Sequence, residues 1–287
     1  MSQPLAVYHP ASIDDALVVL AEMGDAAKVV AGSTALTIML RQRLIEPQAL
    51  VSIGSIPDLD SIVVDGEDLV VGALARHRDV EMSHVVKAHS PVLATTFGQV
   101  ANVRVRNVAT VGGVLAESDY ASDPPAVFVA LDAMVEVTGP EGDRTIPAAQ
   151  FFVAFYETAL APTELVTAVR VPRLPAGAQA VYEKFVTRSS EDRPCVGVVA
   201  VVQLGADRMV EDLRVCVGAA AETPQRFPEI EALARGHSMD VQLTEMIADR
   251  YADAIETLDD MRGSAWYRTE MVRVWVRRAL EHAAGEA

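Results

Sequence analysis

Thr110-Val111-Gly112-Gly113-Val114, followed by the acidic, proline-bounded residues 118–125, is the stretch on which the interpretation of the whole sequence depends. Adjacent glycines let backbone N–H groups approach a ligand without an intervening Cβ, and successive N–H groups can form an anion-binding concavity. Asp123 lies where its carboxylate could cap the helix predicted for the apolar residues 126–131, or bind a ligand hydroxyl. Taken alone, two glycines before a helix are more typical of an ordinary tight turn.

A second glycine-containing stretch, residues 28–36 (KVVAGSTAL), favours the anion-binding interpretation. A short β-type run is followed by Gly32, the hydroxyl residues Ser33 and Thr34, and the apolar periodicity of a helix. The pattern predicts strand–turn–helix, with free N–H groups and the positive end of a helix dipole at the turn. Two such turns in one chain could bind the two halves of a pyrophosphate.

The composition indicates a large globular protein without nucleic-acid or membrane partners. The chain has 287 residues, 51% of them hydrophobic, which is enough for two domains with substantial cores. Its 24 basic and 40 acidic residues give a net charge of −16, which argues against binding to nucleic acid or to an anionic membrane. The N-terminal residues show no signal-peptide pattern, and no apolar run of about 18 residues predicts a membrane span. We therefore expect a cytoplasmic protein.

The cysteines, the histidines and the short motifs of the sequence predict neither a metal site nor a catalytic group of side chains. Cys195 and Cys216 are too few to ligate an iron–sulfur cluster, which needs about four ligands, or to form a disulfide framework. The six histidines show no metal-binding spacing. The sequence also lacks the nucleophile elbow, the phosphate loop and the dinucleotide fingerprint of common enzyme classes. We therefore predict neither a catalytic constellation nor a metal site.

Hydrophobic periodicity predicts an α/β N-terminal part and a C-terminal part in which strands precede helices. In the first part we expect a helix from Ser12 to about Gly24, a strand at 28–31 and a helix through Leu44. Strands at 50–53 and 69–71, arranged as in a meander, come next, and residues 80–108 should be mostly helical, with a break at Pro91 and an extended segment at 103–106. A hairpin over 135–146 and a strand at 164–171 complete this part. After a proline- and glycine-bearing boundary at 172–177 we expect strands at 181–186, 196–204 and 213–217, then helices at 228–235, 241–258 and 266–282. This order is typical of an α+β domain with its helices on one face of an antiparallel sheet.

Arg104 and Arg106, in the extended segment, have two interpretations. A guanidinium suits phosphate oxygens, but a solvated or interface arginine is the commoner case. We do not include them among the predicted site residues.

Several motifs recur together in an order and spacing that resembles a known family. They are residues 31–34 (AGST), 110–113 (TVGG), 122–125 (SDPP), 182–185 (YEKF), 263–268 (GSAWYR) and 277–280 (RRAL). Together they resemble the FAD-binding medium subunits of molybdenum hydroxylases, of the carbon monoxide dehydrogenase and xanthine dehydrogenase type, over essentially the whole chain. The resemblance implies an α+β fold in which a non-Rossmann, PCMH-like FAD-binding domain of two α/β subdomains spans residues 1–175, split near residue 55. A C-terminal α+β domain with an antiparallel sheet and helices would span residues 176–287.

The resemblance also implies where FAD would bind. Two backbone stretches would hold its pyrophosphate, in agreement with the anion-site argument: Ala31, Gly32, Ser33, Thr34 and Ala35, and Thr110, Val111, Gly112, Gly113 and Val114. Asp123 would accept hydrogen bonds from the sugar or phosphate-linker side, and Val166 would form an apolar wall near the adenine. Lys184 would lie close to the flavin and could stabilise a negatively charged reduced ring.

The activity implied by the resemblance is electron transfer through FAD within a heteromeric complex. A large subunit with the molybdopterin cofactor would hydroxylate the substrate. A small subunit with two [2Fe–2S] clusters would pass electrons to FAD, which would reduce an external acceptor, and the family implies a dimer of such heterotrimers. A flavin of this kind needs binding, orientation and tuning from the protein rather than a catalytic triad. Nothing in the sequence identifies the substrate or the acceptor.

Three residues depart from the family pattern: Ser33 replaces a glycine, Val114 an asparagine and Tyr120 a proline. If Ser33 adopts a positive φ the strain costs about 1–2 kcal/mol, and loss of an asparagine hydrogen bond costs roughly 1 kcal/mol. Such costs would weaken FAD binding by about one to two decades without abolishing it. The ring of Tyr120 could pack beside the flavin or line the surface. Two alternative functions remain, a scaffold subunit that has lost FAD and a self-sufficient flavin reductase on a related fold.

Overall fold

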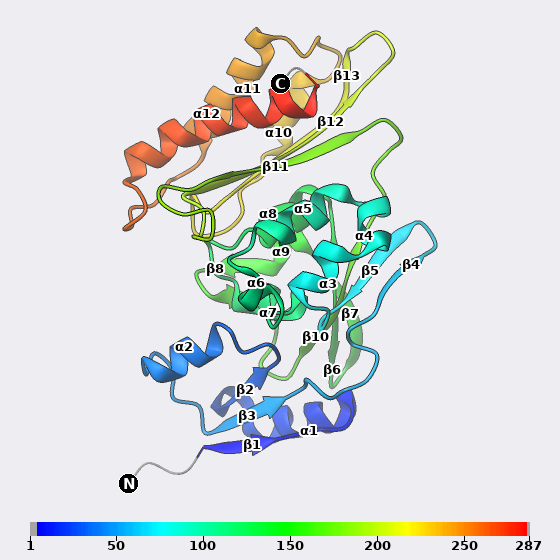
Figure 1. Ribbon diagram of the computed structural model, residues 1–287, viewed down its shortest axis with the longest axis vertical. Helices are drawn as coiled ribbons and strands as arrows, with labels where there is room; N and C mark the ends of the chain where they lie inside the picture. The colour runs from blue at the N-terminus through cyan, green and yellow to red at the C-terminus, as the bar shows by residue number, and fades with distance from the viewer. Residues whose placement is uncertain (1–4, 286–287) are drawn as a thin grey trace.

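The computed structural model describes residues 5–285, which form three parts stacked along the long axis of the molecule (Figure 1). A small N-terminal lobe lies at one end, a part built on a five-stranded sheet lies in the middle, and a C-terminal part with a three-stranded sheet lies at the other end. Within the described residues, none of the helices combines the length and the apolar character needed to cross a membrane.

The N-terminal lobe is a parallel three-stranded sheet covered by one long helix. Its strand order is β1-β3-β2, with β1 at Ala6–Tyr8, β2 at Ala27–Val30 and β3 at Ala49–Ser52. Helix α1 (Ile13–Met23) begins as predicted, because Ser12 Oγ accepts a hydrogen bond from Asp15 N (3.1 Å), and its C-cap is Gly24. A short 3-10 helix, η1 (Gly24–Ala26), leads into β2, and α2 (Leu36–Arg41) follows the first glycine stretch.

The middle part is an antiparallel five-stranded sheet in the order β4-β5-β10-β6-β7. Its strands are β4 (Ile62–Asp65), β5 (Asp68–Gly72), β6 (Met134–Gly139), β7 (Gly142–Pro147) and β10 (Leu165–Val171). Short helices connect and cover it: α3 (His77–Met82), α4 (His84–His89), α5 (Pro91–Gln99), α6 (Val103–Arg106), α7 (Val111–Glu117), α8 (Pro124–Ala130) and α9 (Ala148–Phe151). A two-stranded hairpin, β8 (Phe152–Ala154) and β9 (Glu157–Thr158), completes it.

The predicted meander of residues 50–53 and 69–71 is wrong, because the two strands belong to different sheets. β3 is flanked on both edges by parallel partners, β1 and β2, and has no edge left for β5. β5 instead pairs with β10 on one edge and with β4, a strand that was not predicted, on the other, and Gly66 at φ +63° forms the turn between β4 and β5.

Residues 103–106 form the helix α6 rather than the predicted extended segment. Asn102 Oδ1 accepts hydrogen bonds from Arg104 N (3.1 Å) and Val105 N (3.2 Å), so an N-cap overrides the alternating sequence pattern. The guanidinium of Arg106 binds Glu81 and the carbonyl oxygens of Val100 and Ala101, which makes this arginine structural.

The C-terminal part is the antiparallel sheet β11-β12-β13, with β11 at Gln179–Phe185, β12 at Val196–Leu204 and β13 at Val210–Gly218. The helices that follow are α10 (Pro228–Glu231), the 3-10 helix η2 (Ala232–Ala234), α11 (Val241–Ala254) and α12 (Ala265–Ala283). Figure 1 shows α11 and α12 on the outer face of this sheet and α5 and α8 of the middle part on its inner face. β12 is a continuous apolar run because alternate side chains enter two cores: Val199 and Val201 pack with the middle part, and Val198 and Ala200 with the C-terminal helices.

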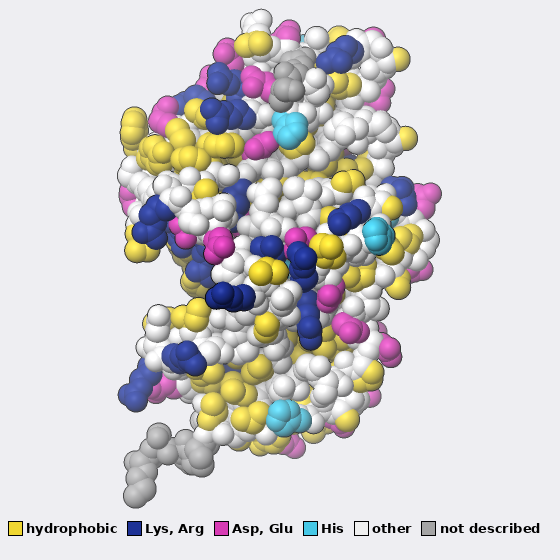
Figure 2. Space-filling model, viewed as in Figure 1, with side chains coloured by type: hydrophobic (Ala, Val, Ile, Leu, Met, Phe, Trp, Pro, Cys, Tyr) yellow, Lys and Arg dark blue, Asp and Glu magenta, His cyan; other side chains and the backbone are white. Residues whose placement is uncertain are grey.

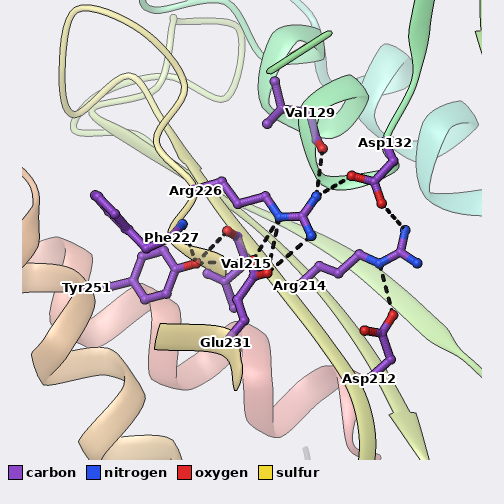
Figure 3. A network of polar contacts seen from close by, with 9 residues as sticks. All are labelled: Val129, Asp132, Asp212, Arg214, Val215, Arg226, Phe227, Glu231 and Tyr251. Carbon is purple, nitrogen blue, oxygen red and sulfur yellow. Dashed lines mark hydrogen bonds and ion pairs between the residues drawn. The ribbon is translucent and has the colours of Figure 1, made fainter. Parts of the chain in front are cut away.

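A polar network fastens the C-terminal part to the middle part at one edge of this interface (Figure 3). Asp132, in the turn after α8, accepts a hydrogen bond from Arg226 and forms an ion pair with Arg214. Arg226 also pairs with the buried Glu231 (2.9 Å), which accepts a hydrogen bond from Val215 N (2.8 Å). Each charge in this network therefore has a partner, as burial requires.

Candidate functional site

A cavity of about 980 Å³ lies at the waist of the molecule, where the N-terminal lobe meets the middle part and the outline of the surface narrows (Figure 2). All three parts contribute to its wall. The lining includes the first glycine stretch and α2, the start and end of α7, residues 156–166, the loop at 187–193, and Met261 with Arg262. A mostly pre-formed cavity between structural parts is the usual location of a cofactor site.

The first glycine stretch supplies free backbone donors to this cavity. β2 ends at Val30 and α2 begins at Leu36, and residues 31–35 between them all line the cavity. Among the described residues, the N–H groups of Gly32, Ser33, Thr34 and Ala35 have no acceptor. Buried or half-buried N–H groups without an acceptor are costly unless a ligand or water pairs with them. This stretch can therefore bind an anion.

Gly32 brings the two glycine stretches together. A Cβ at this position would lie 2.1 Å from the carbonyl oxygen of Val108, so no side chain fits. The backbone at Gly32 therefore packs directly against Val108 and Ala109, which immediately precede the second glycine stretch.

Ser33 adopts φ +56°, the left-handed conformation on which its predicted strain depended. The strain of about 1–2 kcal/mol therefore applies. Its hydroxyl lies 2.9 Å from that of Thr37, in the first turn of α2. Strain of this kind persists where surrounding structure imposes it, commonly at functional sites.

The second glycine stretch is not an anion-binding concavity, and that prediction is wrong. Gly112 and Gly113 lie inside the first turn of α7, with Thr110 as its N-cap. Each N–H group of residues 111–114 donates within the protein, in order to the carbonyl oxygen of Ala75 (2.9 Å), that of Ala73 (2.8 Å), Thr110 Oγ1 (3.2 Å) and the carbonyl oxygen of Thr110 (3.0 Å). The stretch therefore shapes the cavity but offers no free backbone donor there.

The two glycines are needed for close packing. A Cβ on Gly112 would lie 2.6 Å from the Cβ of Ala73, where α7 rests against the segment after β5. Thr110, Gly112, Gly113 and Val114 line the cavity, whereas the fully buried Val111 packs in the core of the middle part.

Asp123 and Lys184 form a buried pair between the middle and C-terminal parts. Asp123 Oδ2 accepts from Lys184 Nζ (3.1 Å), and Asp123 Oδ1 accepts from the hydroxyl of Tyr182 (2.6 Å). Lys184 Nζ also donates to the carbonyl oxygen of Gln99 (2.8 Å). Burial raises the pKa of Asp123, and the Lys184 ammonium opposes that rise.

This pair lies differently from what the resemblance implied. Both oxygens of Asp123 have partners within the protein, although the residue lines the cavity, and its side chain does not cap α8. The ammonium of Lys184 points into the interface between the two parts and not into the cavity. Val166 does line the cavity, beside a bulge in β10 at Val166–Ala168.

Tyr120 links the two parts and does not line the cavity. Its hydroxyl donates to Asp260 Oδ2 (2.7 Å) and accepts from Arg262 Nη1 (3.0 Å), and its ring meets that of Phe155 edge-on at 5.2 Å. The loop that Asp260 holds carries Met261 and Arg262 into the cavity wall. Tyr120 therefore positions the cavity wall indirectly.

The cavity wall also holds titratable residues that were not predicted from the sequence, and two of them, Glu117 and His77, have strongly shifted pKa values. Glu117 is the last residue of α7, and burial beside Asp119 raises its pKa to about 7. The ring of His77 donates from Nε2 to the carbonyl oxygen of Thr110 (3.2 Å), and burial lowers its pKa to about 4, so it is neutral at physiological pH. A prediction that Gly112 and Gly113 begin a helix would have placed Glu117 on that same helix, one turn after Gly113.

Comparison with known proteins gives matches over both halves of the chain. Residues 3–174 match the family described as FAD binding domain in molybdopterin dehydrogenase, and residues 180–283 match the CO dehydrogenase flavoprotein C-terminal domain family. The chain is 34% identical over 284 residues to the nicotine 6-hydroxylase medium subunit of Paenarthrobacter nicotinovorans, covering 99% of each chain. It is 33% identical over 284 residues to the carbon monoxide dehydrogenase medium chain of Hydrogenophaga pseudoflava, covering 99% of this chain and 98% of that one.

Solved structures show the same likeness in three dimensions. The structure of Hydrogenophaga pseudoflava carbon monoxide dehydrogenase that lacks the Mo-pyranopterin moiety matches with a TM-score of 0.95 at 33% identity, over 100% of both chains. Quinoline 2-oxidoreductase from Pseudomonas putida 86 matches with a TM-score of 0.92 at 26% identity, over 100% of this chain and 99% of that one. The similarity extends over the whole length of the chain.

Proposed function

Because the chain belongs to the family of FAD-binding medium subunits that includes the carbon monoxide dehydrogenase medium chain and the xanthine dehydrogenase FAD-binding subunit, we propose that it binds FAD at its waist cavity and transfers electrons through it. The family inferred from the motifs and the α+β fold of two domains are both confirmed. Electrons would come from [2Fe–2S] clusters of a small partner subunit and leave to an external acceptor.

The observation that carries this proposal is the set of four free N–H groups at residues 32–35 on the wall of a cavity of about 980 Å³. Backbone N–H groups without protein acceptors suit a pyrophosphate, and the glycine at position 32 leaves no Cβ between them and the neighbouring stretch. When bound, the flavin would supply the redox chemistry, and the protein would bind and orient it.

The residues of the site divide by their expected contacts. Direct contacts would come from Ala31, Gly32, Ser33, Thr34, Ala35, Thr110, Gly112, Gly113, Val114 and Val166, all of which line the cavity. Val111, Asp123 and Lys184 would act indirectly, by fixing α7 and the interface between the two parts.

The assembly and the domain limits are part of the same proposal. The chain would join a large molybdopterin-binding subunit and a small iron–sulfur subunit in a dimer of heterotrimers. The FAD-binding domain would span residues 1–175, divided near residue 55, and the C-terminal domain residues 176–287. The separate sheets β1-β3-β2, β4-β5-β10-β6-β7 and β11-β12-β13 support this division.

The test is FAD binding by the purified chain and by two glycine variants. In Gly32→Ala the new Cβ would meet the carbonyl oxygen of Val108 at 2.1 Å, whereas in the control Gly54→Ala it meets nothing within 4 Å. We expect Gly32→Ala to weaken FAD binding by about tenfold or more, equivalent to about 1.4 kcal/mol, and Gly54→Ala to leave it unchanged. The proposal would be contradicted if the folded chain bound FAD neither alone nor in the complex with its partner subunits.

A further inference from the structure

Glu117 lies on the cavity wall at the opposite end of α7 from the second glycine stretch. It follows Gly113 by four residues, which places it about 6 Å farther along the helix axis. The side chain is 17% exposed, and the residue lines the cavity. A ligand whose phosphates lie at the first glycine stretch, which packs against the residues just before α7, therefore comes within reach of this carboxyl group if it extends along α7.

The carboxyl group of Glu117 has no hydrogen-bond partner among the described residues. The nearest cation, Arg193, lies 3.7 Å from Glu117 Oε1 and is paired more closely with Asp119. The phenol of Tyr156 lies close enough for the charge of Glu117 to act on it, and Arg262 lines the same cavity. Glu157 also lines the cavity but is exposed to solvent. The carboxyl group therefore has room for a partner supplied by a ligand.

Three features of this environment disfavour the ionised form of Glu117. The side chain is largely buried, the carboxylate of Asp119 lies nearby, and the C-terminal end of a helix carries partial negative charge. Arg193 acts in the opposite direction but is shared with Asp119. The pKa of Glu117 is accordingly raised to about 7, within the physiological range.

We propose that Glu117 is a polar contact of the bound cofactor and must carry a proton for tight binding, so that FAD binding is coupled to protonation of this side chain. The inference rests on the proposed function. FAD brings the negative charges of its pyrophosphate into the same cavity, and an ionised Glu117 would add a further negative charge in a poorly solvated position. In the protonated form the carboxyl group can donate one hydrogen bond to a ligand oxygen and accept another.

The sign of the pH dependence follows from linkage. Bound FAD raises the pKa of Glu117 further, so binding takes up protons and affinity is highest below pH 7. Affinity then falls as the pH rises from the pKa of the free form to that of the bound form. A rise of about one pKa unit on binding corresponds to about a tenfold loss of affinity across the titration.

The test compares the dissociation constant of FAD at pH values from about 6 to about 8.5 for the wild type, Glu117→Gln and Glu157→Gln. Glutamine has nearly the size of protonated glutamic acid and stays neutral. We expect the wild type and Glu157→Gln to lose about tenfold in affinity over this range, and Glu117→Gln to stay nearly constant and to bind more tightly than the wild type at the highest pH. Calorimetry in two buffers of different ionisation enthalpy should show proton uptake in the wild type and not in Glu117→Gln.

The outcomes separate this inference from the proposed function. Parallel pH profiles for the wild type and Glu117→Gln, with FAD bound in both, would overturn the role of Glu117 and leave FAD binding intact. Absence of FAD binding by the wild type at every pH would instead contradict the function itself. Weaker binding by Glu117→Gln at the lowest pH would also overturn the inference, because there both side chains are neutral.

Discussion

Replacement of Lys184 by methionine tests whether this lysine joins the two parts or acts on the flavin. Its Nζ atom donates to Asp123 Oδ2 (3.1 Å) and to the carbonyl oxygen of Gln99 (2.8 Å), and only 5% of its side chain is exposed. Methionine fills a similar buried volume with a flexible apolar chain and removes the charge. The variant therefore leaves Asp123 buried without its counter-charge.

The expected cost follows from this burial. Removal of one partner of a buried ion pair costs about 3–5 kcal/mol. Asp123 keeps the hydrogen bond from Tyr182, so we expect the lower end, about 3 kcal/mol at neutral pH. Burial already raises the pKa of Asp123, and without Lys184 the carboxyl group takes up a proton at a still higher pH.

The pH dependence of the variant has a definite sign. A carboxyl group whose pKa is higher in the folded than in the unfolded state, where it is about 4, stabilises the native state fully at pH values below the unfolded pKa. This stabilisation is lost as the pH rises through the folded pKa. The destabilisation of Lys184→Met should therefore be smaller at about pH 5 than at about pH 8. The double variant Asp123→Asn/Lys184→Met has no buried charge and should recover part of the loss.

The assay is urea-induced unfolding of Lys184→Met, of the double variant and of the wild type at both pH values, together with their FAD affinities. An unchanged free energy of unfolding in Lys184→Met, combined with a large change in flavin affinity or reduction potential, would refute the structural role. That result would support the contact with the flavin implied by the family resemblance.

Other variants test packing and backbone conformation. Gly112→Ala should destabilise the chain by about 1–3 kcal/mol in urea unfolding, because its Cβ would lie 2.6 Å from that of Ala73. Ser33→Gly should be more stable than Ser33→Ala by about 1 kcal/mol, because alanine keeps the strain of φ +56° and glycine does not. Equal stability of the two variants would contradict the left-handed conformation of residue 33. Tyr120→Phe removes the hydrogen bond to Asp260 (2.7 Å) and should cost about 0.5–1.5 kcal/mol, with faster FAD release in stopped-flow because the loop at 260–262 is held less firmly.

Much of the fold could be predicted from local sequence features. The serine cap of α1, the hairpin of β6 and β7, and the three strands and final helices of the C-terminal part all lie close to the predicted ranges. These features depend on hydrophobic period, caps and turn residues, which act over a few neighbouring positions. The family could be inferred for a different reason, since several motifs in the right order identify it together although each is weak alone.

The sequence by itself therefore determined the fold class, the family and the two glycine stretches that meet at one cavity. Only the tertiary structure decided what those stretches do: residues 32–35 keep free N–H groups, whereas those of residues 111–114 are taken by Ala73, Ala75 and Thr110. It also decided that Lys184 turns toward Asp123 and that Glu117 faces the cavity. The physical reason is that a hydrogen-bonding group is free to bind a ligand only when no neighbouring segment of the protein satisfies it. Which segments become neighbours is decided by the whole fold.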